Sequence, residues 1–184
     1  MEPVAELMSL KAYATLDEPD DRHLTELVRG MVVREPRPGR LHGRIQVRLG
    51  HALQSWADAH GRAEVTAESG YILADEPAIV RGPDVALVLD PRPTVGEPGG
   101  WTRGAPDLAV EVLSPSDSSS MIQQKTLDYL ETGARIVWIV DPVARTVTTY
   151  RPDGSARLLR ADETLDGEDL LPGFTLPLAT LFGP

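Results

Sequence analysis

The sequence predicts an α/β (α+β) fold, in which a mixed central β-sheet is flanked by helices and preceded by an N-terminal β-hairpin. Two observations support this prediction. Short strand-like runs are interrupted by two amphipathic helical segments, an order that suits a mixed sheet with helices packed on it. The run from Arg135 to Val140 is apolar on both faces, as expected of a central strand covered on both sides. With 184 residues we expect one domain, residues 1–184.

The N-terminal part predicts a short helix, a hairpin and a long helix. Ser9–Ala14 can form the first helix, and a polar loop follows from Asp17 to Arg22. Two short strands around Arg29-Gly30, ended by prolines, indicate the hairpin. The long amphipathic helix is predicted to end at Gly61, and its apolar residues recur at helical spacing: Leu41, Ile45, Leu49, Leu53 and Trp56.

The middle of the chain predicts strands and a loop. Two segments, residues 62–73 and 78–90, are alternating or continuously apolar over strand lengths. The Gly82-Pro83 pair breaks the second of them. Because Gly and Pro are frequent from Pro91 to Pro106, we expect a surface loop there.

The segment from Pro106 to Pro142 predicts a strand, a turn, a helix and a second strand. The first strand covers Leu108 to Leu113, and the helix extends from about Ser118 to Thr132 before a stop at Gly133. Ser116 or Asp117 is expected to cap the helix, because either side chain can accept hydrogen bonds from free N–H groups. A polar strand, a turn and a short apolar segment close the domain.

Composition excludes several classes of function. The chain has no cysteine, which excludes disulfides, thiolate metal sites and a cysteine nucleophile. It has no signal-peptide pattern and no run of about 18 apolar residues, so we expect a cytoplasmic protein without a membrane partner. The net charge of −10 opposes nucleic-acid binding unless a local patch or a divalent cation provides it. The arginines from Arg34 to Arg48 are either a solvated helix face or such a phosphate-facing patch.

Two carboxylates stand in apolar surroundings. Asp84 precedes the run "VALVL", and Glu111 lies in the middle of an apolar strand. Burying an unpaired carboxylate costs several kcal/mol or more, so each needs a cation or strong donors nearby. If their strands are neighbours, both side chains can point into one cavity. Together with the backbone carbonyl of Val112, they would form the oxygen-rich site that Mg²⁺ prefers, and Mn²⁺ is possible there.

Lys125 is one of only two lysines in the chain, and it can extend this site. It is predicted at the edge of the inward face of its helix, one turn before Tyr129. From there it can reach towards Glu111 and either orient water or neutralise a phosphate. The alternative is a lysine whose stem lies along the protein surface. Tyr129 is interpreted as a core residue whose hydroxyl reaches a polar edge.

The stretches "HLTELVRGMVV", "RGPDVALV", "PDLAVEVLSPSDSSSMIQQKTLDYLETGARIVWIVDP" and "LLPGF" resemble the bacterial Uma-two family of restriction-endonuclease-like proteins, of the PD-(D/E)XK nuclease superfamily. The resemblance covers roughly residues 10 to 182. It implies a mixed sheet of about four to five strands flanked by helices, and Mg²⁺-dependent cleavage of DNA. The usual motif lysine is here Leu113, so the resemblance assigns that role to Lys125, and it places Glu26 near the site.

Other polar residues have simpler interpretations. Glu26 is equally well explained as an exposed hairpin carboxylate, and Asp107, although it shares the strand parity of Glu111, fits a turn role better. Glu68 is a weaker candidate still. The four histidines show no ligand spacing and are interpreted as surface or helix-face residues: His23, His42, His51 and His60.

We therefore expect a Mg²⁺-dependent endonuclease that hydrolyses DNA phosphodiester bonds. Asp84 and Glu111 would bind the metal with Val112, and Lys125 and Glu26 would complete the catalytic set. A homodimer is expected, because cutting both strands of a duplex favours two symmetric sites. The alternatives are a catalytically inactive binding or regulatory module for a protein partner, and an enzyme acting on a small phosphate compound.

Overall fold

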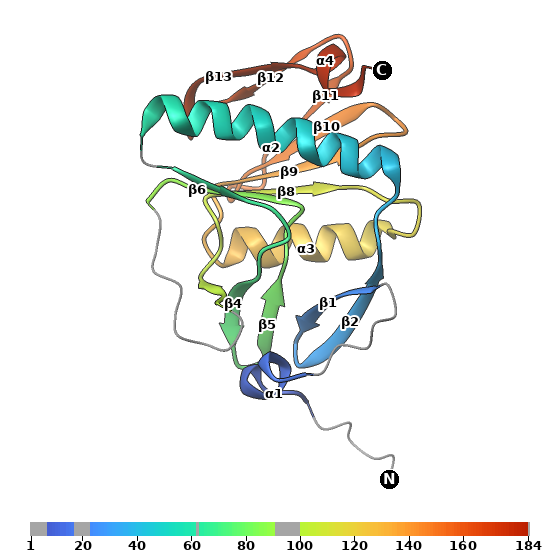
Figure 1. Ribbon diagram of the computed structural model, residues 1–184, viewed down its shortest axis with the longest axis vertical. Coiled ribbons are helices and arrows are strands. Elements are labelled where there is room, and N and C mark those ends of the chain that lie inside the picture. Colours follow the sequence, from blue (N-terminus) through green and yellow to red (C-terminus); the bar gives the residue numbers. More distant parts are fainter. Residues whose placement is uncertain (1–6, 17–22, 62, 91–99, 184) are drawn as a thin grey trace.

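The strands form two large sheets and a separate ribbon in the computed structural model, which describes residues 7–16, 23–61, 63–90 and 100–183 (Figure 1). Sheet A has the order β2-β1-β5-β4-β7 and sheet B the order β11-β10-β9-β8-β6-β3, while β12 pairs with β13. The bounds in chain order are β1 (His23–Val28), β2 (Met31–Pro36), β3 (Glu64–Thr66), β4 (Tyr71–Asp75), β5 (Ala78–Arg81), β6 (Val85–Val88), β7 (Thr102–Arg103), β8 (Leu108–Val112), β9 (Ile136–Asp141), β10 (Thr146–Tyr150), β11 (Ala156–Arg160), β12 (Thr164–Gly167) and β13 (Leu171–Pro177). Both large sheets are mixed, because β4 pairs with β7 and β8 with β9 in parallel while their other pairs are antiparallel. The predicted fold class is confirmed.

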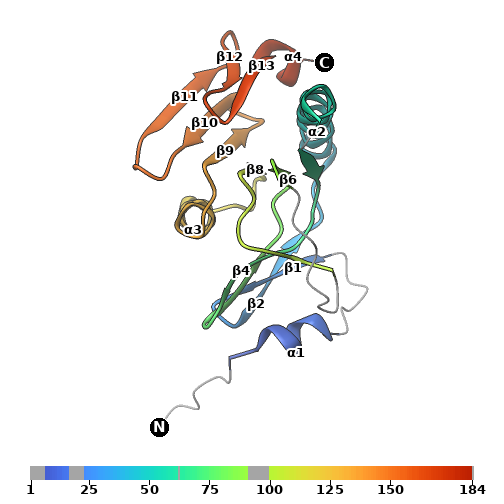
Figure 2. The same cartoon turned by 90° about the vertical axis from the view of Figure 1, so that its left-hand side faces the viewer.

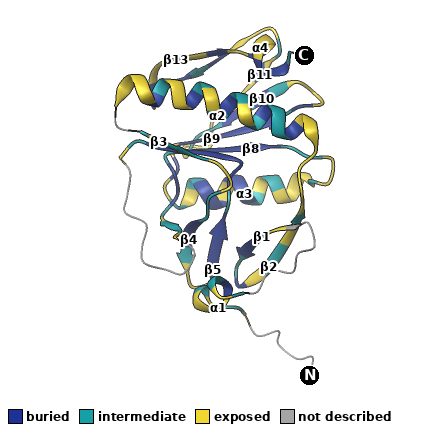
Figure 3. Cartoon of the chain, viewed as in Figure 1, coloured by how far each residue is buried: buried dark blue, intermediate teal, exposed yellow. Residues whose placement is uncertain are grey.

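Two long helices cover opposite faces of sheet B. Figure 2 shows α2 (Arg40–His60) and α3 (Ser119–Glu131) on either side of β6, β8 and β9. Apolar residues of α2 pack with alternate residues of β8, including Val110, and the other face of β8 packs on Tyr129 of α3. Two short helices, α1 (Leu10–Ala14) and α4 (Leu178–Phe182), lie towards the ends of the chain. The central strands are therefore buried on both faces, as Figure 3 shows.

The predicted hairpin and the first two helices are confirmed. The turn residues Arg29 and Gly30 have φ values of 50° and 76°, the pair of positive φ angles that a two-residue hairpin turn needs. Ser9 caps α1 by accepting from the backbone N–H of Ala12, and α2 ends at Gly61 in a left-handed conformation. The predicted polar loop from Asp17 to Arg22 lies outside the described residues.

Three expectations need correction. The segment from 62 to 73 contains two strands that belong to different sheets, β3 and β4. The expected surface loop from Pro91 to Pro106 includes β7 and a buried Ala105, while 91–99 lies outside the described residues. The cap of α3 is Ser118, whose hydroxyl accepts from the N–H of Met121. Asp117 cannot be that cap, because its carboxylate accepts from the N–H of Ser114 across the preceding turn.

Sheet B brings the two predicted strands together. β6 and β8 pair antiparallel, with Val85 opposite Val110, so Asp84, directly before β6, and Glu111, in β8, flank this pair. The alternation along β8 is as predicted: Val110 and Val112 belong to the core under α2, and Ala109 to the core under α3. Glu111 faces the same side as Ala109, where sheet A and α3 meet sheet B.

Candidate active site

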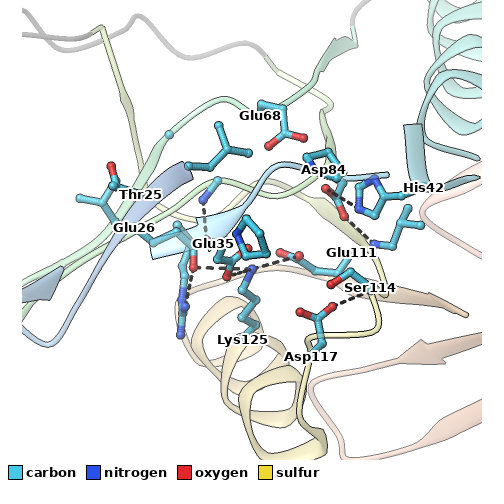
Figure 4. Close-up of a pocket in the computed structure, with 18 of the residues that line it drawn as sticks. Thr25, Glu26, Glu35, His42, Glu68, Asp84, Glu111, Ser114, Asp117 and Lys125 are labelled. Atoms are coloured by element: carbon cyan, nitrogen blue, oxygen red, sulfur yellow. Dashed lines mark hydrogen bonds and ion pairs between the residues drawn. The ribbon is translucent and has the colours of Figure 1, made fainter. Parts of the chain in front are cut away.

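Asp84 and Glu111 line one cavity of about 280 Å³ between the hairpin, α2, α3 and sheet B (Figure 4). Both are buried, with exposed fractions of 9% and 8%. Lys125 and Glu26 line the same cavity, so the structure brings all four predicted catalytic side chains together. The remaining carboxylates of the lining are Glu35, Glu68 and Asp117.

Asp84 is held by one backbone donor and one histidine. Its Oδ2 accepts from the N–H of Val112 at 2.6 Å, and its Oδ1 lies 3.2 Å from His42 Nε2. Burial lowers the pKa of His42, but the hydrogen bond and charge of Asp84 outweigh burial and raise that pKa above its ordinary value. His42 is 8% exposed and lines the cavity from one face of α2, so its interpretation as a surface residue is wrong, while its place on a helix face is as predicted.

Glu111 has two donors from α3. Tyr129, which is fully buried, donates its hydroxyl to Oε1 at 2.8 Å, and Lys125 Nζ donates to Oε2 at 3.3 Å. Burial raises the pKa of Glu111 to about 8; the charge of Lys125 and the hydrogen bond from Tyr129 oppose this shift, while the charges of Asp84 and Glu26 add to it. The predicted interpretation of Tyr129 as a core residue with a polar contact is confirmed.

Lys125 is surrounded by three carboxylates. Its Nζ lies 2.9 Å from Glu35 Oε1, 3.3 Å from Glu111 Oε2 and 3.6 Å from Glu26 Oε2. Burial alone would lower the pKa of Lys125, but these three carboxylates raise it, so the ammonium stays charged at neutral pH. The lysine is 8% exposed, so the alternative of a surface lysine is excluded.

Glu26 connects the cavity to a buried ion-pair network. Its Oε2 accepts from Arg81 at 2.7 Å, and its Oε1 accepts from the N–H of Gly82 at 3.0 Å. Arg81 also donates two hydrogen bonds to Asp128 Oδ2, at 2.6 and 3.1 Å, and Asp128 Oδ1 accepts from Arg29 at 2.8 Å. The network ties the hairpin and β5 to α3. Glu26 is 5% exposed, so it is not an exposed hairpin carboxylate.

Of the two weaker candidates, Glu68 lines the cavity and Asp107 does not. Glu68 lies at the rim of the cavity, where its Oε1 accepts from Gln46 at 2.7 Å. Burial and the charge of Asp84 raise the pKa of Glu68 to about 7. Asp107 is outside the cavity lining, and its carboxylate accepts from the N–H of Leu89, 18 positions away, at 3.0 Å, so its interpretation as a turn residue stays a prediction.

Sequence reasoning missed His42 and Glu35. Neither residue stands in an apolar run, the signal that identified Asp84 and Glu111. Glu35 lies in the edge strand β2, and His42 lies in the first turn of α2. The packing of α2 against sheet B brings His42 to Asp84. The available signal for Glu35 was its charge, because it is the one acidic residue in the arginine-rich stretch between Arg29 and Arg48.

A hard cation fits the donors at the inner end of the cavity. The side chains of Asp84 and Glu111 provide only oxygen ligands, and a carboxylate accepts at up to about four lone-pair sites, so each retains capacity beyond its present contacts. Among the described residues, no three His, Asp or Glu side chains form a metal-binding group by themselves. A bound Mg²⁺ would thus need backbone carbonyl and water oxygens as well, which is the usual coordination of this ion.

The arginines between Arg34 and Arg48 do not act as one surface. Arg48 donates to the backbone carbonyls of Thr180, Leu181 and Gly183, and so fastens the last residues of the fold to α2. Arg37 and Arg40 are exposed, and neither lines the cavity. Arg48 is therefore engaged within the fold, and a phosphate-facing patch in this segment would contain fewer arginines than the sequence suggests.

Comparisons with known proteins agree with this architecture. A family model, Uma2, described as "Putative restriction endonuclease", matches residues 10–179. A crystal structure of a protein from Anabaena variabilis, described as a putative nuclease, superposes with a TM-score of 0.82 at 23% sequence identity. The alignment covers 95% of this chain and 97% of that chain. A comparison with the curated proteins found no match. None of the helices in the described parts of the chain has the length and apolar character that crossing a bilayer requires.

Proposed function

This chain belongs to the Uma2 family, and from that premise we propose that it is a Mg²⁺-dependent endonuclease that hydrolyses DNA phosphodiester bonds. One observation carries the proposal: buried Asp84 and Glu111, from adjacent strands, line one cavity with Lys125. A carboxylate pair that can hold a divalent cation, with a lysine beside it, suits metal-assisted phosphodiester hydrolysis. The proposal includes a cytoplasmic protein and a homodimer, whose two cavities would serve two DNA strands.

Asp84 and Glu111 would hold the metal, with the carbonyl of Val112 as a third ligand. When bound, Mg²⁺ would lower the pKa of a coordinated water and neutralise charge on the phosphoryl oxygens. Mn²⁺ would fit the same oxygen ligands. Six carboxylates and two permanent cations, Lys125 and Arg81, line the cavity among the described residues, and this excess of acidic groups supports binding of a divalent cation.

Lys125 has two roles in this proposal. Its charged ammonium lies next to Glu111, where it can contact a phosphate oxygen and stabilise the charge of the transition state. It can also orient a water molecule, because an ammonium group has three donors. Glu26 and Glu35 position the lysine from the hairpin side, so Glu26 supports the reaction through Lys125 and Arg81 rather than through the metal.

Tyr129 and His42 orient the two metal-binding carboxylates. The tyrosine hydroxyl fixes Glu111 Oε1, and the histidine ring together with the N–H of Val112 fixes Asp84. Partners of this kind hold ligand oxygens in one geometry, and their loss commonly costs about 10- to 100-fold in metal affinity or activity.

The test combines calorimetry with a cleavage assay. Mg²⁺ and Mn²⁺ binding would be measured on the wild type and on Glu111→Gln, beside nicking of supercoiled and single-stranded DNA. Loss of metal binding and of nicking together in the variant would support the nuclease. A wild type that binds no metal would overturn it and favour the inactive binding module.

A further inference from the structure

The cavity has an aromatic end that the proposed reaction does not use. Tyr13 and Trp101 line this end, together with Leu24 and Val80. The hydroxyl of Tyr13 donates to Thr25 Oγ1 at 3.1 Å. Figure 4 shows Thr25 well separated from Asp84 and His42, so the aromatic and the carboxylate ends lie apart within one continuous cavity.

Trp101 is held in a fixed position. Its indole stacks on the ring of Tyr13 with centroids 5.2 Å apart and an interplanar angle of 28°. It also passes directly over Gly70, where a Cβ atom would lie 2.4 Å from Trp101 Cδ1. Gly70 is therefore needed for this close approach. Trp101 is only partly buried and keeps surface towards the cavity, so the fold presents a pre-positioned aromatic surface there.

The charges of the lining do not suit an intact duplex. Among the described residues, six carboxylates line the cavity, and the only permanent cations in that lining are Arg81 and Lys125. Arg81 is 4% exposed and is bonded to Glu26 and Asp128, and Lys125 is enclosed by carboxylates. Affinity for a DNA backbone comes mainly from Lys and Arg that replace counterions. Base stacking on an aromatic ring, in contrast, provides affinity without positive charge.

The size of the cavity supports the same substrate. Its volume of about 280 Å³ lies near the lower limit of pockets that bury one small ligand, about 300 Å³. A base inside a duplex is covered on both faces by its neighbours, so it cannot stack on Trp101. An unpaired base can leave its stack at a lower cost.

We propose that the cavity takes one unpaired nucleotide of a DNA strand, with its base stacked on Trp101 and a phosphate of that strand at the carboxylate end. This inference rests on the proposed nuclease function and names its substrate as single-stranded or locally unpaired DNA. The specificity comes from Trp101 and the narrow cavity, and no base-specific hydrogen bond is required. Tyr13 and Gly70 act as positioning residues for the indole.

The first test measures binding without cleavage. The chain has three tryptophans, of which Trp138 is fully buried and Trp56 lies outside the cavity, stacked on His60. In the variant Trp56→Phe, kept in EDTA to prevent metal-dependent cutting, fluorescence changes on adding DNA would report Trp101. We expect saturable quenching by a short oligothymidylate and much weaker quenching by a hairpin duplex. Equal quenching by both, or no quenching by the single strand, would overturn the inference.

The second test measures cleavage with matched variants. Trp101→Ala should raise the KM for single-stranded DNA by about fivefold or more, the smallest effect of losing one base–aromatic stack, and leave kcat nearly unchanged. Trp101→Phe should keep most of the affinity, because its smaller ring still stacks. An unchanged KM in a folded Trp101→Ala protein would contradict the inference.

The two proposals fail in different ways. If Glu111→Gln abolishes cutting while Trp101→Ala leaves the KM for single strands unchanged, the nuclease stands and the stacking site is wrong. If the wild type shows no metal-dependent cutting but Trp101 is still quenched by single strands alone, the nuclease is wrong and the nucleotide-binding cavity stands.

Discussion

Two groups of ion pairs in this molecule have the same residue types but opposite surroundings. The buried network around Arg81, Asp128, Glu26 and Lys125 forms part of the cavity wall, and the side chains of Arg81 and Asp128 are 4% and 1% exposed. The ribbon cluster joins Arg151 and Arg157 to carboxylates near β12, including Asp166, and the Arg157–Asp166 pair is 46% and 43% exposed. The comparison shows that burial, more than the number of contacts, decides what an ion pair does.

In the buried network each charge depends on its partners, because water cannot replace them. The network therefore helps to fix where Lys125 and Glu111 lie, and its charges act together with burial on the pKa values of both groups. In the ribbon cluster, water and salt compensate for a lost partner, so we expect the pairs to contribute little to stability. The predictions below test this difference, beginning with the largest expected effect.

Asp128→Ala should destabilise the fold by about 3–5 kcal/mol, because it removes the carboxylate that accepts two hydrogen bonds from the buried guanidinium of Arg81. The free energy of unfolding would be measured by urea denaturation. The control is Glu131→Ala, an exposed position on the same helix, which should change stability by about 0.5 kcal/mol or less. A loss below 1 kcal/mol for Asp128→Ala would remove the distinction between the two groups.

Lys125→Met should reduce metal-dependent cleavage by about 10²- to 10³-fold, because it removes the cation nearest to Glu111 and any bound phosphate. Mg²⁺ binding should persist or strengthen in this variant, since Glu26, Glu35 and Glu111 lose a competing positive charge. Calorimetry and a nicking assay on one protein preparation would separate the two effects. Near-normal cleavage would exclude a catalytic lysine.

Glu111→Gln should make stability less dependent on pH in EDTA. The folded protein raises the pKa of Glu111 from 4.5 to about 8, so its neutral form is favoured by folding. The stability that protonated Glu111 contributes is therefore fully present below pH 4.5 and is lost as the pH rises through about 8. The groups facing Glu111 are Lys125, Tyr129, Asp84 and Glu26.

Urea midpoints measured from about pH 5 to pH 8 should fall for the wild type more steeply than for Glu111→Gln. The raised pKa of His42 acts in the same direction in both proteins, because a histidine with a raised pKa also loses its contribution as the pH rises. Glu131→Gln, on the surface of α3, should behave like the wild type. Parallel curves for the wild type and Glu111→Gln would contradict the raised pKa.

Arg157→Ala should have the smallest effect, about 0–1 kcal/mol, because it removes one exposed pair of the ribbon cluster. Raising the salt concentration should shrink this difference further. Urea denaturation at low and high salt would measure it. A loss comparable to that of Asp128→Ala would show that the ribbon cluster supports the fold as the buried network does.

The sequence predicted the parts of this molecule that depend on local patterns. Apolar runs identified β8 and β9, helical spacing identified α2, and the carboxylates within apolar runs identified Asp84 and Glu111. The placement of these two acids and of Lys125 at one cavity is as expected, while their catalytic and metal-binding roles remain predictions.

The rest depended on packing between distant segments. Asp128 is 3% exposed because Arg81, 47 residues away, reaches it from β5, and no local pattern shows this contact. His42 and Glu35 enter the site because the hairpin and α2 pack around sheet B. The separation of β3 and β4 into two sheets likewise follows from tertiary pairing. Helical spacing placed Lys125 only at the edge of the inward face of α3, because the spacing of residues along one helix does not show the three carboxylates that surround the lysine.

The bond between Arg29 and Asp128 joins residues 99 positions apart, and it has a consequence for how the protein folds. Such a contact closes a long loop, and chains rich in distant contacts fold slowly. The hairpin leaves the ribosome before α3, so during synthesis Arg29 and Glu26 cannot yet form their ion pairs with Asp128 and Lys125. The cavity can therefore assemble only after the residues up to α3 have emerged, and we expect a nascent chain that stops before Lys125 to lack the complete site.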